Sequence, residues 1–156
     1  MSKSLKRVQR HAEALGLNIT VVETAIDTHT AAQAAQSQGC EVDQIAKSII
    51  FRGERSGAAI LFLTAGGNRV DAGQAAIVSG EPLGKADATL IRSQTGFAIG
   101  GVSPIGHLNP IRTFMDPRLM DYDAIWAAAG TPRHLFAIDP RKLQQVTQAE
   151  VTCFTG

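Results

Sequence analysis

The pattern of apolar and polar positions first predicts an amphipathic helix near the N-terminus. Within residues 3–15 the apolar side chains follow an i, i+3, i+7, i+10 series, namely Leu5, Val8, Ala12 and Leu15. Gly16 comes next and is a typical helix stop. The basic side chains between the apolar ones, Lys6, Arg7 and Arg10, are predicted to form the solvated face of this helix.

Capping residues predict four shorter helices. Thr30 precedes residues 31–38, which end at Gly39, and Asp71 precedes a near-copy of that stretch that ends at Gly80. The two remaining helices are a segment from Asp87 through Gln94, closed by Gly96, and a short helix that begins at Pro140 and runs to about Val146.

Between these helices, β-branched and aromatic runs predict strands. Residues 48–52 and 58–64 flank a polar, glycine-containing turn and are typical of a β-hairpin. The second run is apolar without alternation, so both faces of that strand are expected to be covered. Further strands are predicted at 19–23, 111–115, 124–128, 135–138 and 150–154. Strands outnumber helices and are often joined by short turns, which favours an α+β fold with a mixed sheet.

Composition sets limits on what this fold does. The 156 residues are 44% hydrophobic and 19% charged, as expected for one soluble domain over residues 1–156. A net charge of +1 argues against non-specific coating of nucleic acid, but it allows a local basic cluster that holds one RNA end. No apolar run is long enough to cross a membrane, and no signal peptide is recognised, so the cytoplasm is the expected compartment. The two cysteines have no metal-binding spacing, and neither a metal nor another cofactor is indicated.

The most distinctive stretch is the glycine-rich segment from Gly96 to His107. Its Gly-Gly pair permits positive φ and close approach of a ligand, while Pro104 stiffens the far side. Such a loop can direct backbone N–H groups at a carbonyl, a carboxylate or a phosphate, although an ordinary glycine turn has the same composition. The segment does not fit G-x-G-x-x-G or G-x-S-x-G, and residues 80–86 do not complete a phosphate-binding loop.

Three segments together carry a family resemblance. They are Gly100–Gly106 (GGVSPIG), Lys47 within Ile45–Phe51 (IAKSIIF), and Ala129–His134 (AGTPRH). In their order along the chain, these segments resemble the YbaK/prolyl-tRNA synthetase-associated editing domains. The resemblance implies a curved, barrel-like mixed sheet flanked by helices, with the site in a cleft over the sheet. It also implies hydrolysis of mischarged aminoacyl-tRNA by a free-standing protein, with the tRNA 3′ end as partner and a tRNA synthetase as a second one.

The same resemblance assigns roles to individual residues. Gly100 and Gly101 are expected to polarise the ester carbonyl, and His134 to face the aminoacyl group. Lys47 is expected to hold the RNA end; without the resemblance it would be a lysine extending from the end of a sheet. Substrate-binding positions are further implied at Ser48, Val102, Ser103, Pro104, His107 and Gly130.

Some of these positions also have simpler interpretations. Ser48 follows Lys47 and is expected on the opposite strand face, where the alternative to substrate binding is that it only holds a backbone group. His107 either lines the pocket rim or caps the loop. His29 is a further candidate for the cleft, whereas Arg112 and Asp116 are interpreted as strand-end charges. Two other functions remain open: a non-catalytic module that binds aminoacyl-tRNA or a synthetase, and a hydrolase of small-molecule esters.

Overall fold

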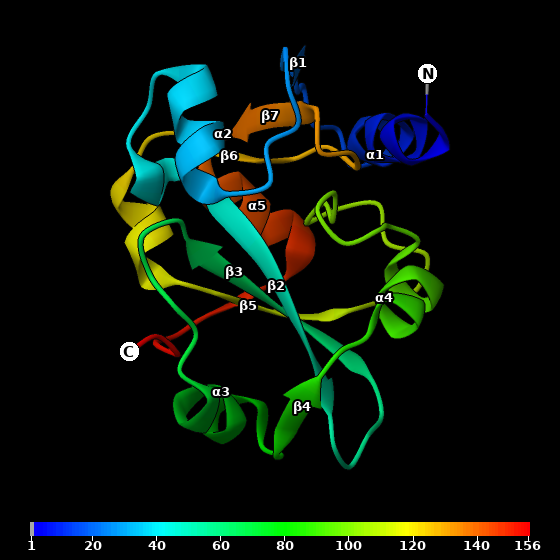
Figure 1. The fold of residues 1–156 in the computed structure, drawn as a ribbon, viewed down its shortest axis with the longest axis vertical. Coiled ribbons are helices and arrows are strands. Elements are labelled where there is room, and N and C mark those ends of the chain that lie inside the picture. The colour runs from blue at the N-terminus through cyan, green and yellow to red at the C-terminus, as the bar shows by residue number, and fades with distance from the viewer. Residues whose placement is uncertain (1) are drawn as a thin grey trace.

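The computed structural model describes residues 2–156, and this range contains five α-helices, two short 3-10 helices and eight strands (Figure 1). The helices are α1 (Lys3–Ala14), α2 (Ala31–Gln38), η1 (Val42–Gln44), α3 (Ala72–Ser79), α4 (Ala88–Thr95), η2 (Pro117–Asp121) and α5 (Pro140–Thr147). The strands are β1 (Val21–Glu23), β2 (Ala46–Gly53), β3 (Ala59–Ala65), β4 (Leu83–Lys85), β5 (Arg112–Met115), β6 (Ile125–Ala128), β7 (His134–Ile138) and β8 (Glu150–Val151).

The short helices begin and end at their predicted caps. The Thr30 hydroxyl accepts from the Gln33 N–H at 3.1 Å, and Gly39 ends α2 at φ 65°. Asp71 and Asp87 cap α3 and α4 in the same way through their carboxylates. Because these signals act within one turn of chain, the five predicted helices are confirmed to within about one residue of their ends.

The strands form two sheets. One has the order β4-β2-β3-β5-β8, with antiparallel pairs around β2 and parallel pairs between β3, β5 and β8; the other is the antiparallel sheet β1-β7-β6. This confirms the α+β class with a mixed sheet. β3 lies in the centre and is buried along its whole length, as its unbroken apolar run predicts. β4 was not predicted, and the last strand is shorter than expected.

The sheets do not close into a barrel, which corrects the barrel-like expectation. An isolated bridge between Ile45 and Trp126 links them in the described part of the chain. β2 pairs with β4 over residues 51–53, so the edge of residues 46–49 has no strand partner within residues 2–156. This opening at the N-terminal end of β2 positions the candidate site.

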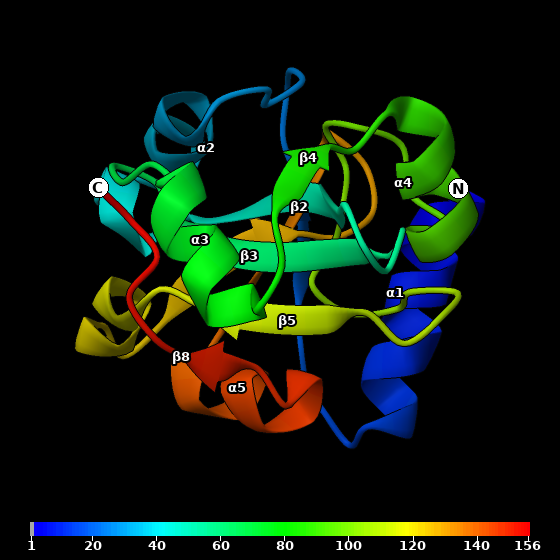
Figure 2. The ribbon, with the colours of Figure 1, turned by 90° about the horizontal axis from the view of Figure 1, so that it is seen from below.

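Three apolar clusters hold the layers together. The largest lies between the two sheets and includes the buried faces of α1, α4 and α5. A second lies under the opposite face of the five-stranded sheet, where α3 crosses it (Figure 2) and Phe62 stacks on Phe114 with ring centroids 5.2 Å apart. The third joins α2 to Ile45 and Leu135. The first and third clusters fix β2, β6 and β7 around the opening.

Candidate functional site

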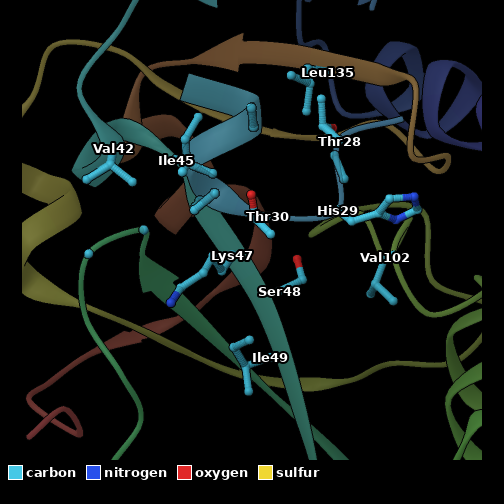
Figure 3. Close-up of a pocket in the computed structure, with 18 of the residues that line it drawn as sticks. Thr28, His29, Thr30, Val42, Ile45, Lys47, Ser48, Ile49, Val102 and Leu135 are labelled. Carbon is cyan, nitrogen blue, oxygen red and sulfur yellow. The ribbon is translucent and has the colours of Figure 1, made fainter. Parts of the chain in front are cut away.

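A cavity of about 670 Å³ occupies the opening beside β2. It is bounded by the segment before α2, by the first residues of β2, by the turn after β3, and by the loop after α4 (Figure 3). Its polar or glycine lining residues are Thr28, His29, Thr30, Lys47, Ser48, Gly66, Gly67, Asn68, Arg69, Gly100 and Thr131. Of the ten residues expected in a site, Lys47, Ser48, Gly100 and Val102 line this cavity.

Lys47 and Ser48 both face the cavity although they are neighbours on one strand. Successive side chains of a strand point to opposite faces. Because the strand edge is unpaired here, the cavity extends around β2. The Lys47 and Ser48 side chains project from the strand in different directions and both reach the cavity (Figure 3). The alternative that Ser48 only holds a backbone group is wrong, since its hydroxyl oxygen is buried without a hydrogen-bond partner within residues 2–156. A buried hydroxyl without a hydrogen-bond partner is unfavourable unless a ligand supplies that partner.

Lys47 is half-buried, and its ammonium donates a hydrogen bond to the Asn68 carbonyl at 2.6 Å. Burial is the main cause that lowers the pKa of Lys47, and the nearby Arg69 cation lowers it further. The carboxylates of Asp116 and Asp43 act in the opposite direction. Lys47 and the exposed Arg69 therefore form a cationic end of the cavity, suited to an anion.

The glycine-rich loop is anchored at both ends by α1. The Arg7 guanidinium donates to the carbonyls of Gly96 and Gly106, each at 2.8 Å, and lies over the Phe97 ring. His11 accepts the Gly106 N–H through Nδ1. The expectation of a purely solvated basic face on α1 is therefore wrong for Arg7.

The two glycines of this loop have different surroundings. Gly100 is exposed at the cavity, with φ 94° in the left-handed region, and none of the described residues accepts its N–H. Gly101 is buried outside the cavity, and its N–H donates to the Ala98 carbonyl at 3.1 Å. A Cβ at Gly101 would lie 2.9 Å from the Thr131 Cα, so this glycine is required for packing. Of the two amides expected to polarise a carbonyl, that of Gly101 therefore already has an acceptor.

Ser103, Pro104 and His107 do not line the main cavity. Ser103 and Pro104 are buried within the loop, and the His107 Nε2–H donates to the Ser103 carbonyl at 2.7 Å. Burial is the main cause of the lowered pKa of His107. Pro104 and His107 face a separate cavity of about 360 Å³ on the far side of the loop. His107 therefore caps the loop and does not form a rim of the main cavity.

Gly130 and His134 also lie outside the cavity wall. A Cβ at Gly130 would approach the Ser4 carbonyl to 2.9 Å, so this glycine allows the turn to pack on α1. Leu135, and not His134, lines the cavity, because side chains alternate along β7. His134 Nδ1 instead hydrogen-bonds the Thr131 hydroxyl at 2.6 Å, and Thr131 faces the cavity. His134 thus reaches the cavity through Thr131.

His29 does line the cavity, next to the loop. Its Nε2 lies 3.6 Å from an Asp27 carboxylate oxygen, and Asp27 also binds Arg133 at 2.9 Å. A Cβ at Gly100 would be 3.9 Å from the His29 Nδ1. His29 and Gly100 are therefore neighbours in the cavity wall.

Sequence reasoning missed the turn after β3 and Thr131. Gly66-Gly67-Asn68 is a turn signal at the end of a strand, and Arg69 adds a cation to it, so this second glycine pair could have been recognised. Thr131 lies inside the Ala129–His134 segment that carried the resemblance, but His134 was chosen in its place. The alternation of side chains along β7 directs Leu135, and not His134, to the cavity. Asp116 was interpreted as a strand-end charge but is only 2% exposed.

Within residues 2–156, no three His, Cys, Asp or Glu side chains gather as a metal site would need. None of the helices in that range combines the length and apolar character that a membrane span requires.

Comparison with known proteins places the chain in a family. The family described as "Aminoacyl-tRNA editing domain" matches residues 26–146. The uncharacterized protein YwhH of Bacillus subtilis (strain 168) is 28% identical over 148 residues, covering 95% of this chain and 94% of that protein.

Two solved structures are similar over nearly their whole length. A protein proposed as a trans-editing enzyme for prolyl tRNA synthetase is 45% identical, with a TM-score of 0.93 and coverage of 100% of this chain and 99% of that chain. The hypothetical protein APE2540 is 25% identical, with a TM-score of 0.88 and coverage of 96% and 99%. The family match confirms the resemblance carried by the Lys47, Gly100 and Gly130 segments, and the chain belongs to the aminoacyl-tRNA editing domains.

Proposed function

We propose that this protein is a free-standing deacylase that hydrolyses the ester between an amino acid and the 3′ ribose of tRNA. The observation that carries the proposal is the two-ended cavity. Lys47 and Arg69 lie at one end, and the exposed Gly100 amide lies on another wall of the same 670 Å³ space. A site for an aminoacyl-tRNA end needs both a place for phosphate and ribose and a place for the acyl group.

The cationic end is suited to the RNA. An ammonium and a guanidinium side by side bind a phosphate through charge-assisted hydrogen bonds. The Lys47 ammonium has three donors, and the Asn68 carbonyl takes one of them. The remaining donors serve the terminal phosphate or the ribose hydroxyls.

At the acyl end, the Gly100 N–H is proposed to polarise the ester carbonyl. One preorganised donor of this kind is typically worth about 3 kcal/mol of transition-state stabilisation. The unpaired Ser48 hydroxyl is available as a second donor. An ester is already activated, so a bound water held near the Thr131 hydroxyl can act as nucleophile, with the vicinal ribose hydroxyl assisting its position.

The remaining wall is proposed to select the amino acid by size. It consists of Ile45, Leu135 and several alanines, an apolar surface between α2 and β7. A synthetase distinguishes one methylene by only about 1–3 kcal/mol, so small amino acids are the ones that require editing. The similar structure, described as a trans-editing enzyme for prolyl tRNA synthetase, supports a proline-specific tRNA that carries a wrong amino acid as the substrate, and that synthetase as partner.

The test is a deacylation panel with Ala-, Ser-, Cys- and Pro-tRNA, using wild type, Lys47→Ala and the control Lys85→Ala. Lys85 is an exposed lysine on β4 outside the cavity wall. We expect wild type and the control to remove at least one amino acid, and Lys47→Ala to lose about a hundredfold or more, the effect of removing a charge-assisted contact. Equal rates for all three proteins would contradict the proposal.

Two other outcomes would indicate other functions. Tight binding of every aminoacyl-tRNA without turnover would indicate a non-catalytic module. Hydrolysis of free amino-acid esters without any RNA-dependent activity would indicate a small-molecule esterase.

A further inference from the structure

The position of Lys47 depends on a turn that lies far from it in the sequence. Its ammonium hydrogen-bonds the main-chain carbonyl of Asn68, at 2.6 Å, in the Ala65–Arg69 turn after β3. A lysine side chain has four flexible bonds, so a fixed acceptor is required to hold the ammonium in one place. What fixes the Asn68 carbonyl therefore also fixes Lys47.

A buried carboxylate holds the first half of this turn. Asp116 is 2% exposed, and its Oδ2 accepts from the Ala65 N–H at 3.1 Å and from the Asn68 side-chain amide at 2.9 Å. Its other oxygen accepts from the Arg118 N–H at 3.0 Å. A buried charge persists only when such donors surround it, and Asp116 has three.

The parallel pairing of β3 with β5 places Asp116 there. Met115 pairs with Leu63, and the Asp116 N–H donates to the Leu63 carbonyl at 2.8 Å. The residue after β5 is thus brought beside the end of β3. The carboxylate then reaches the turn that follows β3.

The η1 segment holds the second half. The Asp43 carboxylate accepts from the Gly67 N–H at 2.8 Å. A Cβ at Gly66 would lie 2.1 Å from the Val42 carbonyl oxygen, so the turn packs against η1 as closely as glycine allows. The Asn68 carbonyl is thereby tied to two separate elements.

We infer that Asp116, acting through the Ala65–Arg69 turn, is a positioning residue that holds the Lys47 ammonium in place for an anionic group of the substrate. The inference rests on the proposed function only for the identity of that group, the phosphodiester of an RNA end. Asp116 does not line the cavity, so its role is to position Lys47 and not to bind the substrate itself. Its negative charge also favours the protonated form of Lys47, opposing burial and Arg69.

The decisive variant is Asp116→Asn, and its first readout is the pKa of Lys47. Lysines are labelled by reductive 13C-methylation, the Lys47 signal is assigned with Lys47→Arg, and the titration is followed by NMR. Replacing the carboxylate by a neutral amide removes the charge that raises the Lys47 pKa, so the titration midpoint should move to lower pH. Asp139→Asn, a helix-capping carboxylate outside the cavity wall, is the matched control and should leave the midpoint unchanged.

The second readout is kinetic. With the aminoacyl-tRNA that wild type hydrolyses, Asp116→Asn should raise KM about tenfold with little change in kcat, because Lys47 holds the RNA end and not the acyl group. A residue that merely stabilised the fold would change neither the Lys47 midpoint nor the ratio of the two kinetic constants.

Asn68→Ala covers the case in which Asp116→Asn does not fold. It keeps the main-chain carbonyl and the Asp116 charge but removes the side-chain amide that ties them together. We expect KM to rise a few-fold and the Lys47 signal to shift or broaden. An unchanged Lys47 titration and KM in whichever of these variants folds would overturn the inference. The NMR result stands even if the protein proves to have no deacylase activity, so the two failures are distinguishable.

Discussion

The cavity lies between two glycine pairs, Gly66–Gly67 and Gly100–Gly101, that present the backbone in opposite senses. The first belongs to a turn whose Asn68 carbonyl faces the Lys47 cation. The second belongs to a loop whose Gly100 N–H faces the cavity without an acceptor among residues 2–156. The Gly66–Gly67 turn thus presents the Asn68 carbonyl as a hydrogen-bond acceptor for a cation. The Gly100–Gly101 loop presents the Gly100 N–H as a hydrogen-bond donor for a carbonyl oxygen. The same dipeptide serves either end because glycine allows close packing on both sides.

Gly66 and Gly100 also differ in what requires the glycine. A Cβ at Gly66 would collide with backbone, whereas a Cβ at Gly100 would meet nothing closer than 3.9 Å. Gly100 is instead required by its φ of 94° and by the open space that a ligand would fill. Substitution of Gly66 should therefore mainly lower stability, whereas substitution of Gly100 should also lower activity.

The largest stability effect is expected for Gly66→Ala. The new Cβ would lie 2.1 Å from the Val42 carbonyl oxygen, so η1 or the turn must move. Such overpacking costs about 3 kcal/mol at the upper end of its usual range. Urea unfolding measures this, with Gly39→Ala as control, since Gly39 has a φ of 65° and nothing within 4 Å of its Cβ position. Equal losses in the two variants would show that the turn is not closely packed on η1.

A smaller stability effect and a separate rate effect are expected for Gly100→Ala. A left-handed φ costs about 1–2 kcal/mol for a residue with a Cβ, so Gly100→Ala and Gly39→Ala should lose similar stability. Only Gly100→Ala should slow single-turnover deacylation, by about tenfold, because its Cβ enters space that the acyl group needs. If Gly39→Ala slows the reaction equally, the rate loss comes from stability and not from the site.

Thr131 and His134 should behave as one unit on the acyl side. Thr131→Val keeps the shape of the side chain but removes the hydroxyl bonded to His134, and we expect deacylation about five- to tenfold slower with unchanged tRNA affinity. His134→Ala should have a similar effect, and combining the two should add little. His134→Asn can still reach the hydroxyl and should keep most of the rate. Additive effects in a double-mutant cycle would mean that His134 acts independently of Thr131.

The smallest effect is expected from the titration of the Lys47 ammonium, because it changes tRNA affinity only at alkaline pH. Burial and the Arg69 charge lower its pKa, so its positive charge is lost as pH rises, sooner than for an ordinary lysine with a pKa of about 10.4. Affinity for uncharged tRNA should therefore fall at alkaline pH with a midpoint below that value. Lys47→Arg keeps its charge throughout and should show no such fall. A wild-type midpoint at or above the ordinary value would contradict the burial of this ammonium at the site.

The sequence predicted what local signals determine. Thr30, Asp71 and Asp87 place their helices because a cap acts within one turn. The short β4 was missed because Pro82 and Gly84 suggest a loop, and its pairing with β2 is a long-range contact.

Of the residues that line the cavity, the sequence indicated His29 from its place before the α2 cap and four others through the family resemblance. Lys47, Ser48, Gly100 and Val102 line the cavity. Lys47 and Ser48 both line the cavity because the edge of β2 is unpaired there, and no local sequence pattern predicts which strand edges are unpaired. Asp116 is 51 residues from Ala65, which it holds, so only the parallel register of β3 and β5 identifies it.

The central claim is that one cavity holds the RNA at Lys47 and the acyl group at Gly100. The most direct test measures two quantities for wild type, Lys47→Ala and Gly100→Ala: the Kd for uncharged tRNA, and the single-turnover deacylation rate at saturating enzyme. We predict that Lys47→Ala mainly raises the Kd, and that Gly100→Ala mainly lowers the rate while the Kd stays within about twofold. If both variants change the same quantity by the same factor, or if wild type binds tRNA and hydrolyses no aminoacyl ester, the two-ended site is contradicted.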